Sequence, residues 1–73
     1  MPDLPTDSRS CILAAIDRIV AGGKLATAEE IERVAGVSKN DRVAILPALV
    51  EEGVLVTAPV SGVRGKRYHW RRA

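Results

Sequence analysis

The chain has 73 residues, 47% of them hydrophobic, and a formal net charge of +2. This length allows one small domain with one core and leaves little volume for a large ligand pocket. The core must be aliphatic, since the chain holds no Phe, one Tyr and one Trp. Cys11 is the single cysteine, which excludes an intrachain disulfide and indicates a small apolar residue. No membrane span or signal peptide is evident, so we expect a cytoplasmic protein.

The charge is distributed unevenly along the chain. Residues 1–52 hold six Lys/Arg and nine Asp/Glu, a net charge of −3, whereas residues 53–73 hold five Lys/Arg and no acid. A cationic end on a mildly acidic body indicates a polyanionic partner, although a solvated basic tail has the same composition. Alternation and glycines within this end favour a folded element over a simple tail.

The first part of the chain predicts a flexible segment followed by a helix. Residues 1–7 hold two prolines and no periodicity, so we expect the domain to span residues 8–73. Asp7 or Ser8 can cap the first helix, and Gly22-Gly23 ends it. Its buried face is predicted to consist of Ile12, Leu13, Ile16, Ile19 and Val20.

A short strand and a second helix follow. Residues 24–26 are extended and long enough for a minor strand. Thr27 and Glu30 have the spacing of a capping box, in which each side chain accepts from the other residue's backbone amide. The helix is about two turns long and Gly36 stops it. Its apolar face is predicted to hold Ile31, Val34 and Ala35.

A three-residue turn then leads into a third helix. Val37 is an apolar residue that we expect to be buried at the corner between the two helices. Ser38 and Asp41 repeat the spacing of a capping box. The third helix is predicted over residues 39–52, ending at Gly53. Two capped helices joined by Gly-Val-Ser are typical of a helix-turn-helix, although any small pair of helices at a corner has this pattern.

The hydrophobic period changes from about 3.6 to 2 after the third helix, which predicts a β-hairpin. Residues 54–58 and 67–71 form its strands and residues 59–66 its loop. In this register Tyr68 and Trp70 share one face, which we expect to close the core against the first and third helices. The other face carries Arg67, His69 and Arg71 and is predicted to point to solvent or phosphate.

The segment GVSKNDRVAILPALVEEGVL resembles the corresponding part of the winged helix-turn-helix of bacterial transcription regulators. Leu46, Leu49 and Gly53 stand at the spacing typical of that family. The resemblance covers residues 8–71 and implies an α+β fold, with three helices packed on a small antiparallel β-hairpin wing. The size and the glycine-rich cationic ending are most similar to the very small regulators of fimbrial operons, and MarR-like and phage or plasmid regulators share the core pattern.

The resemblance implies a sequence-specific regulator that binds double-stranded DNA, with the third helix in the major groove. Asn40 is then a candidate for hydrogen bonding to adenine, and Arg42 for hydrogen bonding to guanine. Arg42 can instead form a salt bridge with a neighbouring acid. Val43 can pack on a thymine methyl group. Lys39 lies in the same first turns and is a candidate contact, although Lys39 and Asn40 can equally be solvated surface residues.

Further phosphate contacts are predicted at helix N-termini and in the wing. Thr27 and Ser38 lie where free amides favour an anion. The wing tip, Arg64, Lys66 and Arg67, is expected to clamp the backbone or enter the minor groove, with Arg71 adding charge. If the five cations after residue 53 each neutralise one phosphate, log K should fall with log salt at a slope of roughly −4 to −5.

One alternative function stays open, because the third helix is unusually apolar. Pro47 removes a backbone hydrogen bond inside it and predicts a kink. Its apolar residues can cover a homodimer partner or another protein, as in winged-helix modules that bind proteins and not DNA. We expect neither an enzyme nor a bound metal, cofactor or small molecule, because no nucleophile–base pair, ligand cluster or phosphate loop is evident and His69 stands alone.

Overall fold

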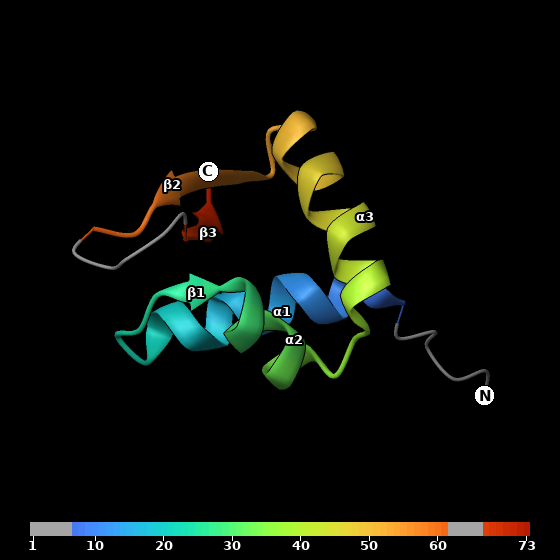
Figure 1. Cartoon of the computed structure of the whole chain (residues 1–73), viewed down its shortest axis with the longest axis horizontal. Helices are drawn as coiled ribbons and strands as arrows, with labels where there is room; N and C mark the ends of the chain where they lie inside the picture. The colour runs from blue at the N-terminus through green and yellow to red at the C-terminus, as the bar shows by residue number, and fades with distance from the viewer. Residues whose placement is uncertain (1–6, 62–66) are drawn as a thin grey trace.

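The computed structural model describes residues 7–61 and 67–73 and has an α+β architecture. Within these residues the elements are α1 (Ser8–Ala21), β1 (Ala26–Thr27), α2 (Ala28–Ala35), α3 (Lys39–Glu51), β2 (Leu55–Pro59) and β3 (Tyr68–Arg72). The strands form one antiparallel sheet in the order β1-β3-β2. In Figure 1, α1, α2 and β1 lie together in the lower part of the view, α3 rises beside them on the right, and β2 and β3 lie above β1 on the left.

Helix α1 begins and ends where its sequence predicts. Asp7 is the N-cap, and its Oδ1 accepts a hydrogen bond of 2.7 Å from the backbone N–H of Ser10. Gly22 is the C-cap and Gly23 has a φ of 78°. The prediction that Val20 is buried is wrong, because its side chain is 47% exposed. Ala15 is buried instead, since it lies on the side of the helix that faces the core.

The turn between α2 and α3 depends on one glycine and one serine. Gly36 ends α2 with a φ of 70°, a left-handed conformation that a side chain would strain. Ser38 is the N-cap of α3, and its Oγ accepts from the backbone N–H of Asp41 at 3.1 Å. Val37, between them, packs against the core as predicted. The chain therefore leaves α2 and starts α3 in a new direction.

The predicted capping box at Thr27 is wrong in its side-chain bonds. Thr27 is the N-cap of α2 but makes no side-chain cap hydrogen bond. The carboxylate of Glu30, expected to reach back to Thr27, accepts instead from Arg33, at 2.7 to 3.0 Å. A guanidinium three residues away competes with the backbone amide for the same carboxylate, and a charged donor forms the stronger bond.

We predict that the two cap residues differ in their contribution to stability. Ser38→Ala should lower the free energy of unfolding by about 1 kcal/mol, because it removes the oxygen that binds the N–H of Asp41. Thr27→Ala should have a smaller effect, because its hydroxyl makes no cap bond. Urea denaturation followed by circular dichroism measures both values. Equal losses in the two variants would contradict the difference in capping.

Helix α3 runs from Lys39 to Glu51 and includes Pro47 without interruption as an α-helix. The helix is therefore not broken at Pro47, and the kink in its axis stays a prediction. Pro47 lies on the exposed side, where the carbonyl of Val43, which loses its helical donor, can bind water. Leu46 and Leu49 are the buried residues of this helix. The side facing the core therefore keeps its packing.

Each strand of the hairpin begins and ends one residue later than predicted, at Leu55–Pro59 for β2 and at Tyr68–Arg72 for β3. Trp70 is paired with Thr57 on one side and with Ala26 on the other, and paired residues share a face of the sheet. Leu55 is two residues from Thr57, so it lies on this face too, where it is buried. Trp70 packs against the core as predicted. Tyr68 does not close the core, because it lies toward the loop end of the hairpin and is 45% exposed.

Polar contacts join α1 to the elements that follow it. Arg9 forms an ion pair with Glu52 after α3, and Arg72 donates to Asp17 from both Nε and Nη2 at 3.0 Å. The hydrogen bonds from Arg9 lower the pKa of Glu52. Because the folded-state pKa is lowered, this contribution to stability is present at neutral pH and is lost as the pH falls through that pKa. These contacts orient α3 and the hairpin on α1.

Candidate nucleic-acid interface

The exposed side of α3 carries one continuous row of side chains. Lys39, Val43, Pro47 and Glu51 follow one another at four-residue spacing, and all four are exposed. We call these four residues the α3 ridge. Val43 is 51% exposed, which is high for an apolar residue of its size. The ridge is thus apolar in the middle and oppositely charged at its ends, and Asn40 lies exposed beside it.

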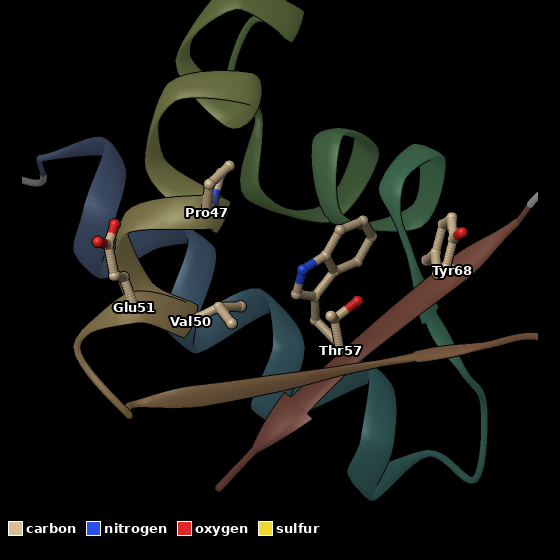
Figure 2. A pocket seen from close by; sticks show the side chains of 6 residues that line it. Pro47, Val50, Glu51, Thr57 and Tyr68 are labelled. Carbon is tan, nitrogen blue, oxygen red and sulfur yellow. The ribbon is translucent and has the colours of Figure 1, made fainter.

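An apolar hollow of about 480 Å³ separates α3 from the hairpin. Its α3 wall is formed by Pro47, Val50 and Glu51, so it continues directly from the ridge. Thr57, Tyr68 and Trp70 form the strand wall. In Figure 2, Val50 points from α3 toward the strands that carry Thr57 and Tyr68.

A second hollow, of about 320 Å³, lies on the other side of the same aromatic residues. Tyr68 and Trp70 line both hollows. The remaining wall of the second hollow contains Thr27, Glu29 and Arg67, together with Ala28. The structure therefore brings the start of α2, the start of β3 and the exposed side of α3 onto one continuous surface. We call this the α3–hairpin surface.

Arg42 does not lie on the α3 ridge. It forms an ion pair with Glu32 of α2, and its side chain is only 14% exposed. Of the two roles predicted for Arg42, the ion pair with a neighbouring acid is the one formed. A contact with guanine would require this partly buried pair to open, so Asn40 and Val43 are the more accessible candidates for base contact.

We predict that Arg42 and Glu32 are coupled in stability. Arg42→Ala and Glu32→Ala should each destabilise the fold, and the double variant should lose less than the sum, with a coupling of about 1 kcal/mol. Urea denaturation of the four proteins measures the coupling. A coupling near zero, together with a changed DNA sequence preference for Arg42→Ala, would instead identify Arg42 as a base-reading residue.

The predicted wing cations occupy different environments. Arg67 is exposed and donates to Glu29 at 3.0 Å, so part of its charge is neutralised within the protein. Arg71 is exposed opposite Val56, on the sheet face that points away from the core. Arg64 and Lys66 lie outside the described residues.

The helix N-termini that were predicted to bind phosphate differ from one another. The Thr27 hydroxyl has no cap bond and borders the second hollow. Ser38 already accepts from Asp41, whose carboxylate in turn accepts from Ser8 at 3.2 Å. An anion at the start of α3 would therefore meet the carboxylate of Asp41, and one at the start of α2 would meet Glu29 and Glu30 in the first turn of that helix.

Two residues of the α3–hairpin surface were not predicted from the sequence to lie on it. Tyr68 was predicted to lie in the core, but its position at the loop end of the hairpin exposes it. Glu29 was not predicted to take part in a binding surface, yet it borders the second hollow and pairs with Arg67. Neither placement has a local sequence signal, because each depends on how β3 aligns with α2.

Among the residues that the structure describes, no cluster of His, Cys, Asp or Glu could hold a metal ion. In the same residues, no helix is long and apolar enough to cross a membrane. Comparison of the chain with protein-family models, curated proteins and solved structures found no match.

Proposed function

We propose that this protein is a winged helix-turn-helix regulator of transcription that binds double-stranded DNA. The support comes from the arrangement of α2, a three-residue turn, α3 and an antiparallel hairpin, with β3 as the central strand. The observation that carries the proposal is the α3–hairpin surface. It combines an exposed helix with the start of a cationic hairpin, as a duplex with a groove and two phosphate rows requires.

In this proposal the first turns of α3 enter the major groove. Asn40 can form two hydrogen bonds with adenine and Val43 can contact a thymine methyl group, each good pair contributing about 1–3 kcal/mol of discrimination. Lys39 is exposed and can reach a phosphate. Tyr68 adds a hydroxyl donor and an aromatic ring at the backbone, next to the predicted wing.

The electrostatic contribution comes mainly from the wing. Arg72 pairs with Asp17 and Arg71 lies on the outer sheet face, so neither is placed to add a contact on the α3–hairpin surface. The described cations of this surface are Lys39 and Arg67, and the sequence adds Arg64 and Lys66 in the predicted wing. We therefore expect a salt slope of about −3 to −4, shallower than the charge count alone predicts.

A fluorescence anisotropy titration with a random duplex at several salt concentrations tests the proposal. We expect binding that weakens with added salt at the slope above. A selection of bound sequences from a random DNA pool then tests specificity. Absence of salt-sensitive binding at micromolar protein would contradict DNA binding.

We predict that Glu29 weakens DNA binding by neutralising Arg67. Glu29→Gln should raise affinity for any duplex by about threefold, because it frees one cation and removes one acid from the surface. Glu52→Gln is the matched control: it removes the same charge from an arginine pair that joins α1 to the end of α3. Equal gains in both variants would show an effect of net charge alone.

A second function has one specific observation in its favour. The hollow between α3 and the hairpin is apolar, and DNA phosphates would not fill it. A winged helix that binds another protein can use such a hollow for an apolar side chain. If the folded protein shows no salt-sensitive binding to DNA, this second function is favoured.

A further inference from the structure

The α3 ridge has a symmetry that an antiparallel copy of itself would match. Its charged ends, Lys39 and Glu51, lie twelve positions apart, and Val43 and Pro47 lie symmetrically between them. When two such helices pack antiparallel about a two-fold axis that passes midway between Val43 and Pro47, each Lys39 lies opposite Glu51 of the second copy. Each Val43 then lies opposite Pro47 of the second copy. Isologous interfaces have this reciprocal pairing.

The charges at the two ends of the α3 ridge are the reverse of what the helix dipole favours, whereas Asp41, beside the ridge, supplies one acid in the first turn. An isolated helix is stabilised by anions at its N-terminus and cations at its C-terminus. The first residue of α3 is Lys39 and its last is Glu51, and its last turn holds no basic residue. An antiparallel second copy would place a carboxylate at each N-terminus and an ammonium group at each C-terminus. Among the described residues, no ion pair within the chain involves Lys39 or Glu51.

The surface beside the ridge also fits a second helix. Ala44 and Ala48 are exposed next to it, and small side chains allow two helices to approach closely. Pro47 and Glu51 form one wall of the apolar hollow. The side chain of Val43 from the second copy would meet Pro47 at the edge of this hollow. Packing of rows at four-residue spacing from both helices is the commonest helix–helix geometry in globular proteins.

We infer that two copies of this chain associate through antiparallel packing of their α3 ridges. The interface joins Val43 to Pro47 at the centre and Lys39 to Glu51 at both ends. Asn40 and Val43 are then covered, so a dimer of this kind and a duplex compete for the same side of α3. The inference does not rest on DNA binding, because self-association is measured without DNA.

Sedimentation equilibrium of the full chain, with charge-reversed variants, tests the inference. Lys39→Glu and Glu51→Lys should each weaken the dimer by about tenfold, since each turns two attractions into two repulsions. The double variant carrying both changes should restore it, because opposite charges then face each other again at both ends of the interface. Each change also suits the dipole of α3, so the folded state should be retained. Circular dichroism checks this.

Arg18→Glu is the control, because it makes the same change of charge as Lys39→Glu at an exposed position on α1. It should leave the dimer unchanged. A monomer at every soluble concentration would overturn the inference, as would a dimer that the single reversals do not weaken or that the double variant does not restore.

Addition of duplex to the dimer separates this inference from the proposed function. If both hold, the duplex dissociates the dimer as it binds. If the chain does not bind DNA, the mass of the dimer is unchanged by duplex while its response to the charge reversals remains. If the chain binds DNA but stays a monomer in its absence, the self-association is wrong and the proposed function stands.

Discussion

Ile16→Ala should leave a large fraction of the molecules unfolded at 25 °C. Ile16 is fully buried, in one cluster with Ile12, Leu49 and Leu55. Truncation of such a side chain costs about 2–5 kcal/mol, because it loses apolar burial and leaves a cavity. The core of a domain this small contributes a net stability of only about 3–5 kcal/mol. Thermal denaturation followed by circular dichroism should show a midpoint lowered by about 10 °C or more.

Val20→Ala is the control for this experiment. Val20 lies on the same helix but is 47% exposed, so its truncation should change the free energy of unfolding by less than about 0.5 kcal/mol. Similar losses in the two variants would contradict the assignment of the core. A midpoint for Ile16→Ala close to that of the unmodified chain would contradict it as well.

Simultaneous replacement of Arg64, Lys66 and Arg67 by Ala should weaken binding to all duplexes about equally. If each cation neutralises one phosphate, the salt slope becomes shallower by about 2 to 3 units. Phosphate contacts carry no sequence information, so the preferred sequence should not change. Anisotropy titrations with a preferred and a random duplex, at several salt concentrations, measure both quantities.

A second triple variant controls for net charge. Arg18, Lys24 and Arg33 surround a separate hollow between α1 and α2. Their replacement by Ala removes the same charge away from the α3–hairpin surface, and we expect a much smaller change in slope. If the two triple variants behave alike, the wing has no specific role.

By contrast, Asn40→Ala should alter the preferred DNA sequence and leave the salt slope unchanged.

The helix ends could be predicted because their signals are local. Asp7 and Ser38 cap helices through bonds to amides three residues away, and Gly36 ends α2 by adopting a positive φ. The change of period after Gly53 likewise predicted two strands, with ends displaced by one residue. These signals depend on atoms within a few residues, so the sequence contains the information directly.

Side-chain partners could not be predicted in the same way. Glu30 has the spacing of a capping residue but binds Arg33, and Arg42 lies in the predicted reading helix but pairs with Glu32 of α2. For Glu30 the spacing rule names the wrong partner, and for Arg42 the sequence leaves two kinds of partner open, because the choice depends on which charged groups lie within reach. For Arg42 that partner is brought near only by the packing of α2 against α3.

By itself, the sequence determined three helices, a hairpin, their order and most of the core, because turn chemistry and hydrophobic period act locally. The tertiary structure decided which surface is available for binding. It exposed Tyr68, joined the start of α2 to the hairpin and α3, and left the α3 ridge facing solvent. The physical reason is that exposure and pairing depend on the register of β3 and the packing angle of α3, and both are set by residues distant in the chain.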